Sequence, residues 1–373
     1  NEEIEAGFPN LPAGCYIQME RVAQKYILEN IKNTTIDYKP NILRKLRNWK
    51  RTVDKPLNFG NFLDFYGIKP YIFYKRGYWS RLCVEAGLRS DFGDPHEKEL
   101  GKALQRLELC NSRIFLRFII NLLRTCIKFE QSSQTYGDFL NQFTEHRRAW
   151  SNNDKLLYNM LYYTLWYHHA DKIDSFESID ESFWVLVHEN PTGVEEILQL
   201  AQYNENRISF VSKPIELAFE CPLEIHCNYS TDQVLAALGY YTEDKKPRFS
   251  EGVKYIKEKN LDVFFIELNK QEKHYSPSTL YEDYPVSKRL FHWQSQSRTT
   301  PSSPTGKRYL STNENHDHQV LIFVREYRKM HGTASPYIFL GLGSLVSYEG
   351  SKPISIVWQL NKEIPPHLLK YTR

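Results

Sequence analysis

The sequence predicts an α+β protein, in which an N-terminal all-helical region is followed by a curved β-barrel domain. Two observations support this prediction. Apolar residues recur at helical spacing through roughly the first two hundred residues, whereas short or alternating apolar runs follow residue 219. Short strands with long, turn-rich connections favour a small barrel or curved sheet. We place the boundary near residues 210–225, and expect a helical domain over 1–218 and a strand-rich domain over 219–373.

The helical region is expected to contain several packed helices. Apolar residues keep helical spacing over residues 17–31, 114–123 and 156–165. Thr192 and Glu195 fit the capping-box pattern, which predicts that a further helix begins there and runs to about Tyr203.

The C-terminal region is expected to open with a short helix and to continue as strands. Ser230 and Gln233 fit a capping box, and Gly239 suits the end of the helix that follows. Apolar runs predict strands over residues 263–268, 320–324 and 337–340. Alternation over residues 354–360 predicts another strand with one buried face.

Composition and charge exclude several classes of protein. The hydrophobic fraction of 41% and the charged fraction of 25% are ordinary for a soluble protein, and the net charge of +3 is too small to indicate a polyanion partner. Six scattered cysteines without a C-x-x-C pair favour a reduced, cytoplasmic protein. There is no apolar run of about eighteen residues, so we expect no membrane partner. The chain begins with Asn1, from which we expect a piece of a longer polypeptide.

Motifs for nucleotide binding and catalysis are missing. A phosphate-binding loop needs a glycine five residues before its Gly-Lys pair, but Gly101–Lys102 has His96 there and Gly306–Lys307 has Pro301. The motif that begins at His96 resembles that of a phospholipase-D-type nuclease, yet Ala103 stands where the motif needs aspartate. We therefore expect no catalytic residue and no cofactor in this chain.

Two histidine clusters were weighed as metal ligands. His168–His169 and His316–His318 each lack a third ligand at a suitable spacing. We expect the first pair to be packed in a helix and the second cluster to be exposed in a polar loop, so no metal site is predicted.

A basic cluster without internal acidic residues spans Lys39–Arg51 and includes Trp49. Such a cluster can contact phosphates, because its charges release counterions from a duplex. A solvated helix face, or a docking surface for another domain, explains the cluster equally well.

The segment Tyr275–Tyr309 combines aromatic, hydroxyl, amide and basic side chains. Cations beside flat aromatic rings suit a polyanion with stackable bases. Its aromatic residues could also form a barrel core. The candidate phosphate contacts are Arg289, Arg298, Lys307 and Arg308.

The same segment has the composition needed to hold a flipped base. Aromatic rings can stack on both faces of the base, and polar side chains can read its Watson–Crick edge. A carboxylate would suit the exocyclic amine of cytosine. The candidate stacking residues are Tyr275, Tyr281, Tyr284, Phe291 and Trp293, and the candidate edge readers are Asp283, Gln294 and Ser295.

Several motifs carry a resemblance to a known family. Phe291–Ser297, preceded by Tyr281–Tyr284 and followed by Leu321–Glu326 and Phe339–Gly341, resembles the C-terminal domain of unknown function that follows superfamily 2 helicase modules. Leu11–Glu20 is similar to the entry to that region. Within this family the chain looks closest to the SauUSI-like type IV, modification-dependent restriction endonucleases.

The resemblance implies a fold and a function. It implies an SRA-like barrel of the PUA superfamily that reads 5-methylcytosine or 5-hydroxymethylcytosine in duplex DNA by base flipping. The implied partners are modified double-stranded DNA and the helicase and nuclease domains upstream in the same polypeptide, with residues 1–218 as the coupling region. Cleavage and ATP hydrolysis would belong to those upstream domains. A sequence-blind single-strand clamp and a protein-interaction module are the alternatives.

Overall fold

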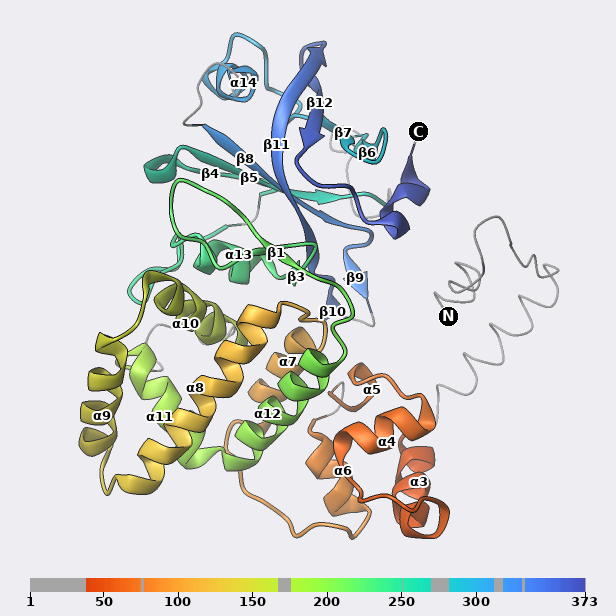
Figure 1. Ribbon diagram of the computed structural model, residues 1–373, viewed down its shortest axis with the longest axis vertical. Coiled ribbons are helices and arrows are strands. Elements are labelled where there is room, and N and C mark those ends of the chain that lie inside the picture. Colours follow the sequence, from red (N-terminus) through yellow and green to blue (C-terminus); the bar gives the residue numbers. More distant parts are fainter. Residues whose placement is uncertain are drawn as a thin grey trace, which may run out of the picture. The chain divides into compact units, whose positions relative to one another are not determined.

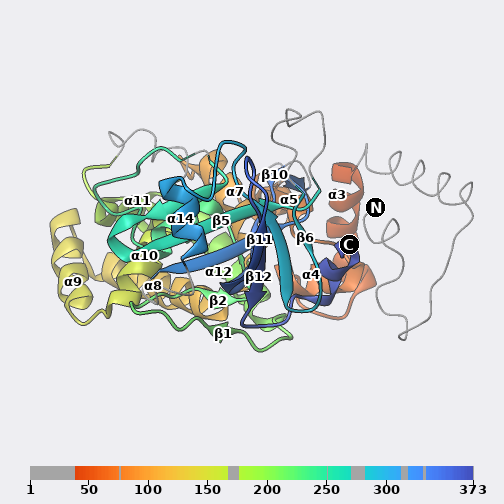
Figure 2. The same cartoon turned by 90° about the horizontal axis from the view of Figure 1, so that it is seen from above.

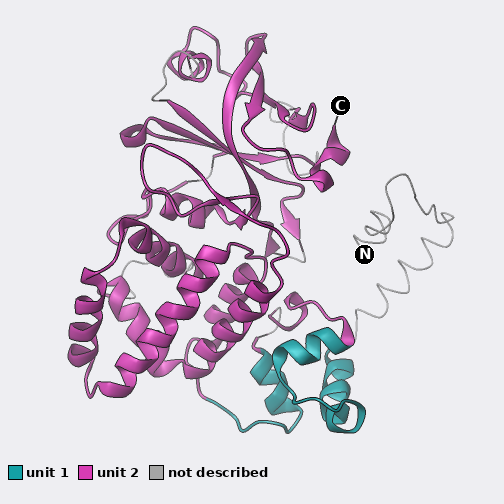
Figure 3. Ribbon diagram, in the orientation of Figure 1, with its two compact units in different colours: residues 1–65, 79–92 teal, residues 66–78, 93–373 magenta. Residues whose placement is uncertain are grey.

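The computed structural model describes residues 38–74, 77–166, 176–249, 251–269, 282–311, 318–330 and 333–372. The chain divides into two compact units, one of residues 1–65 and 79–92 and the other of residues 66–78 and 93–373 (Figure 3). Helices come first along the chain and the sheet follows, which confirms the predicted α+β class. The boundary predicted near residue 218 falls inside the larger unit and stays a prediction.

In the described part of the smaller unit, three helices surround an aromatic core. These are α3 (Tyr38–Thr52), α4 (Phe59–Tyr66) and α6 (Trp79–Glu85). The Phe62 ring lies 5.7 Å from Trp49 and 5.0 Å from Trp79, centroid to centroid. Trp49 is therefore a core residue, whereas most of the basic side chains of α3 are exposed.

Helices α7 to α12 gather at one end of the larger unit (Figure 1). Helix α8 contacts α9, α11 and α12, and α7 contacts α10 and α12. The helices predicted over residues 114–123 and 156–165 are confirmed as α8 and α10. The helical elements are α5 (Tyr71–Tyr74), α7 (Glu97–Leu107), α8 (Arg113–Ser132), α9 (Tyr136–Arg148), α10 (Asn152–Leu165), α11 (Ile179–Glu189) and α12 (Pro191–Asn206).

The start of α12 differs from its prediction. The helix begins one residue before Thr192, after an Asn190 that makes no side-chain capping bond. Instead Asp94 accepts hydrogen bonds from the backbone N–H of Thr192 at 3.4 Å and of Gly193 at 2.6 Å. The predicted capping box is wrong, because a carboxylate from a distant loop satisfies these amides.

The strands form one principal sheet in the order β4-β5-β8-β11-β12-β7-β6, with β3 (Asn228–Tyr229) also paired to β11 (Figure 1). The pair β5 and β8 is parallel, and the other pairs are antiparallel. The sheet strands are β4 (Val253–Ile256), β5 (Leu261–Glu267), β6 (Tyr284–Pro285), β7 (Leu290–Gln294), β8 (Gln319–Arg325), β11 (Tyr337–Glu349) and β12 (Ser355–Leu360).

The sheet does not close on itself among the described strands, so the expected closed barrel is not observed there. Two register shifts on β11, between Phe339 and Gly341 and between Leu345 and Ser347, interrupt its pairing with β8 and β12. Bulges of this kind bend and twist a strand. Two short pairs complete the structure: β1 (Lys213–Pro214) with β2 (Glu224–Ile225), and β9 (Lys329–Met330) with β10 (Thr333–Ala334).

The four predicted strands are confirmed as β5, β8, β11 and β12, although β11 continues far beyond residue 340. In β12 the apolar residues Ile356, Trp358 and Leu360 are buried and the residues between them are not, as the alternation predicts. The capping box of Ser230 and Gln233 is also confirmed, at the start of α13 (Thr231–Ala237).

One face of the sheet packs against α14 (Pro304–Leu310), which contacts β11. Figure 2 shows α14 and the sheet from above. Gly306 lets the loop before α14 approach the helix closely, because a Cβ there would lie 1.9 Å from the carbonyl oxygen of Thr300. The core between them includes Phe264, Phe291, Trp293, Tyr309, Ile322, Ile356 and Trp358.

Helices and sheet are joined in the larger unit through buried Glu224 of β2. Its carboxylate accepts hydrogen bonds from Ser112 Oγ at 2.6 Å, and from the backbone N–H of Ile114 at 3.3 Å, at the start of α8. Ser212 donates to the other carboxylate oxygen. Helix α13 adds a second junction through its contacts with α10.

Candidate nucleic-acid interface

Strand β7 carries three of the eight residues proposed for base recognition, Phe291, Trp293 and Gln294, and its pleat separates them. Phe291 and Trp293 are buried, while His292 and Gln294 on the opposite face are partly exposed. The strand pairs with β6 on one side and β12 on the other. The sequence analysis did not identify this strand, although the alternation of apolar and polar residues over 290–294 was the available signal.

The inward-facing candidates belong to the core. The Trp293 ring stacks on Phe264 with centroids 4.1 Å apart, and Tyr309 meets it edge-on at 5.3 Å. Phe291 is fully buried in the same cluster. Ser295 is also fully buried, and its Oγ accepts a hydrogen bond from the Ile354 N–H at 2.9 Å. These three side chains therefore stabilise the sheet and do not face solvent.

The outward face of β7 presents a stacked aromatic pair. The rings of Tyr284, on the edge strand β6, and His292 lie 4.6 Å apart and are inclined by 18°. His292 Nδ1 lies 2.8 Å from the Glu282 carbonyl oxygen, and because a carbonyl can only accept, Nδ1 carries the proton. The hydrogen bond fixes the orientation of the imidazole beneath the tyrosine.

Two polar candidates hold this outward face together. Asp283 Oδ1 accepts a hydrogen bond from the Gln294 backbone N–H at 3.0 Å. The Gln294 side chain accepts from the Glu282 N–H at 2.9 Å and donates to Ser355 Oγ at 3.3 Å. Both residues thus fix the approach of β6 and β12 to β7. The remaining candidates, Tyr275 and Tyr281, lie outside the described residues.

Three of the four proposed phosphate contacts are exposed. Arg289 precedes β7, and its Nε lies 3.9 Å from the similarly exposed Glu363 carboxylate. Arg298 follows the other end of the strand, and Lys307 lies on α14. A further cation, exposed Lys352, was missed by the sequence analysis; its backbone N–H donates to the Thr299 carbonyl oxygen at 3.0 Å, beside Arg298.

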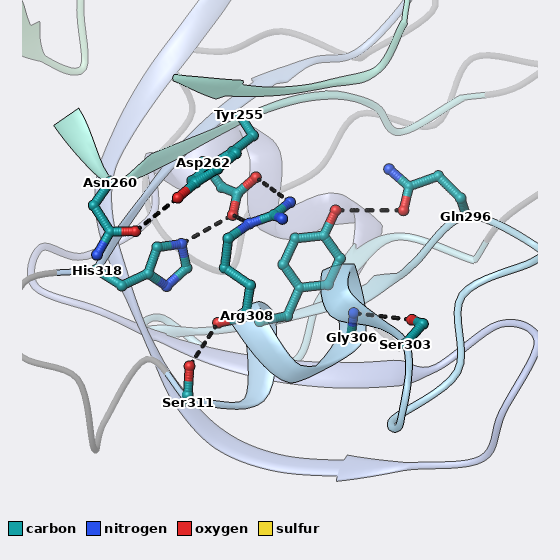
Figure 4. A network of polar contacts seen from close by, with 10 residues as sticks. Tyr255, Asn260, Asp262, Gln296, Ser303, Gly306, Arg308, Ser311 and His318 are labelled. Atoms are coloured by element: carbon teal, nitrogen blue, oxygen red, sulfur yellow. Dashed lines mark hydrogen bonds and ion pairs between the residues drawn. The ribbon is translucent and has the colours of Figure 1, made fainter. Parts of the chain in front are cut away.

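Arg308 is placed differently from the other three cations (Figure 4). Its Nε and one terminal nitrogen donate to the fully buried Asp262 at 2.6 and 3.1 Å, and its guanidinium lies 3.9 Å from the centre of the Tyr255 ring. Burial alone would lower the pKa of Arg308, but the hydrogen bonds and charge of Asp262 outweigh it and the pKa is raised. A phosphate contact would have to compete with this structural partner.

His318 completes the Asp262 network. Its Nε2 lies 2.9 Å from Asp262 Oδ2, and only 3% of the residue is exposed. The expectation of simple solvent exposure is therefore wrong for His318, because a buried carboxylate holds it inside. His316 and Asp317, like His168 and His169, lie outside the described residues.

Two cavities lie elsewhere in the larger unit. One of about 390 Å³ is bordered by α7, the start of α13 and the start of β11, and one of about 490 Å³ is bordered by Tyr74, Gly77 and α7. Neither is lined by β7. Within the described ranges, no group of three His, Cys, Asp or Glu side chains could hold a metal ion. No described helix is both long and apolar enough to cross a membrane.

Comparison with models of known families identifies a match that covers the sheet. Residues 223–372 match the model of a family described as Domain of unknown function (DUF3427). The matched range includes every strand from β2 to β12 and the whole of the β7 face. No curated protein matches the chain.

Proposed function

We propose that the C-terminal region binds double-stranded DNA and selects duplexes that contain 5-methylcytosine or 5-hydroxymethylcytosine. The observation that carries the proposal is the outward face of β7, defined as Asp283, Tyr284, His292 and Gln294, with exposed cations at both ends of the strand. A five-residue strand spans about 17 Å, which is the rise of roughly five base pairs. Cations at both ends can therefore contact separated phosphates while the stacked pair between them faces the bases.

The chemistry of this face suits bases better than a protein surface. Aromatic rings bind bases by stacking, and cations bind the backbone with strong dependence on salt. Tyr284 is held by His292, so little side-chain entropy is lost when a base stacks on it. In this proposal Tyr284 stacks on a base. The phosphates are bound by Arg289, Arg298, Lys307 and Lys352.

The family resemblance supports the finer part of the proposal. The region matched by the DUF3427 model is the one that resembles the C-terminal region of SauUSI-like type IV restriction endonucleases. In this proposal the sheet is an SRA-like variant that reads a flipped, modified cytosine. Upstream helicase and nuclease domains of the parent polypeptide would act on the DNA, and the junction at Glu224 would transmit binding to the helices.

The test is a titration of the 373-residue chain with three DNAs of one sequence at matched salt: methylated duplex, unmethylated duplex and single strand. We expect methylated duplex to bind at least ~10-fold more tightly than unmethylated duplex, which is the scale of discrimination that one methyl group allows. Tyr284→Ala should reduce the affinity for methylated duplex. Tyr203→Ala is the matched control, since Tyr203 is also a partly buried tyrosine but lies on α12, where a guanidinium and not an imidazole lies against its ring.

The outcomes separate the competing functions. Equal affinity for the two duplexes would remove modified-base selection from the proposal. Tighter binding to single strand, regardless of methylation, would favour a sequence-blind clamp. Absence of salt-sensitive binding to any of the three DNAs would favour a protein-interaction module.

A further inference from the structure

The cavity of about 390 Å³ beside α7 has the composition of a ligand site. Its volume is within the range of small-molecule sites, which begins near 300 Å³. Three separate parts of the larger unit form it: α7, the turn into α13, and a third part made of Arg325 at the end of β8 and residues 333–337. None of the residues that line it belongs to the β7 face.

Three cations from two of these parts border the cavity. Lys102 and Arg106 lie four residues apart on α7 and therefore share one face of the helix, and Arg325 ends β8. Two carboxylates lie close to these cations. Glu267 accepts a hydrogen bond at 2.9 Å from Arg325 itself, and Asp232, which lines the cavity, lies 3.6 Å from Lys246.

The two guanidinium groups are held in fixed positions. Arg106 donates from Nε and a terminal nitrogen to the Thr164 carbonyl oxygen at 2.9 and 2.5 Å. Arg325 is fixed by Glu267, and its guanidinium lies 4.5 Å from the centre of the Tyr337 ring. Guanidiniums ordered before a ligand arrives lose little entropy on binding, and their fork geometry matches phosphate oxygens.

The rest of the lining is divided between hydroxyl and apolar groups. Ser230, Thr231 and Ser335 supply hydroxyls that can donate to a phosphate oxygen, whereas the Thr333 hydroxyl donates to the Met330 carbonyl oxygen at 3.0 Å. Leu109 and Pro336 supply apolar surface. The ligand that fits this combination has an anionic group with several acceptor oxygens and a less polar body.

We propose that this cavity binds a phosphate group carried on a nucleotide-sized body, either a free nucleotide or one unit of a nucleic-acid strand. Lys102 and Arg106 bind the phosphate, Arg325 adds a contact while it stays paired with Glu267, the hydroxyls complete the hydrogen bonds, and the apolar lining contacts the body. The site is independent of modified-base recognition by β7. It bridges α7 and the sheet, so an occupant stabilises the helical layer and the sheet together.

The experiment measures binding to the 373-residue chain by calorimetry. The probes are inorganic phosphate, a nucleoside monophosphate, a nucleoside triphosphate and a short unmethylated oligonucleotide. Lys102→Glu reverses an exposed charge at the cavity. We expect it to weaken binding at least ~10-fold, equivalent to about 1.4 kcal/mol. The control is Lys128→Glu, which makes the same change at an exposed position of α8 that lines neither cavity.

A second variant separates loss of the site from loss of fold. Ala334→Trp, at an exposed position of β10 that lines the cavity, should fill it and abolish binding while the far-UV circular dichroism stays unchanged. If free nucleotides bind and both variants weaken that binding, the ligand is a free nucleotide. If only the oligonucleotide binds and both variants weaken that binding, the ligand is a nucleic-acid strand. The proposal is overturned if no probe binds with a Kd below about 1 mM. It is also overturned if both variants bind the probes as tightly as the wild type does.

Discussion

The two faces of β7 show how one segment can serve both stability and recognition. The inward face places Phe291 and Trp293 in the core, and the outward face presents the stacked pair of Tyr284 and His292. Both faces are rich in aromatic residues, so composition does not distinguish them. The period of two along the strand does, because it sends neighbouring side chains to opposite sides of the sheet.

The cations of the same segment divide in a similar way. Arg308 is paired with a fully buried carboxylate, whereas Arg298, ten residues earlier, is exposed. Sequence spacing alone treats the two as equal phosphate contacts. The difference arises because Asp262 on β5 lies within hydrogen-bonding distance of one guanidinium, and this neighbour is remote in the sequence.

The largest effect that tests this division is expected for the inward face. Trp293→Ala removes a ring that packs between Phe264 and Tyr309, and should lower the free energy of unfolding by about 4 kcal/mol. Urea unfolding followed by circular dichroism measures the change. A loss below about 1 kcal/mol would contradict the core assignment, since a cavity of that size is costly.

The next largest effect is expected at Arg308. Arg308→Leu leaves Asp262 buried without its bidentate partner, and should lower the free energy of unfolding by about 3 kcal/mol. Arg298→Leu, the matched exposed change, should alter it by about 0.5 kcal/mol or less. Equal effects of the two substitutions would show that the buried ion pair does not separate these arginines.

The smallest effect concerns DNA binding through the exposed cations. Arg298→Gln and Lys307→Gln should each reduce the dependence of log affinity on log salt concentration by about 1, without changing the preference among sequences. Fluorescence anisotropy at several salt concentrations measures this slope. If the slope is unchanged in both variants, the phosphate contacts lie elsewhere on the chain.

Local signals in the sequence predicted much of the fold. Apolar runs located β5, β8 and β11, alternation located β12, and the capping box at Ser230 located the start of α13. The same type of motif failed at Thr192, where Asp94 satisfies the helix amides from another part of the chain. A local motif predicts structure reliably only when no distant residue supplies the same hydrogen bonds.

The candidate site was less predictable than the fold. The sequence pointed to the segment that contains the partly exposed Tyr284 and the exposed cations Arg289, Arg298 and Lys307. It could not separate them from Phe291, Trp293 and Ser295, because the strand that separates them was missed. Lys352 was also missed, since its neighbour Arg298 is brought close by pairing of β7 with β12.

The sequence by itself determined the order of helices and strands, the faces that alternation assigns to β12, and the presence of an aromatic, basic segment. These properties depend on the spacing of residues along the chain. The tertiary structure decided which arginine meets Asp262, which aromatic rings enter the core, and which cations border the cavity beside α7. Those outcomes depend on partners that lie tens of residues away, and only folding brings these partners within contact distance.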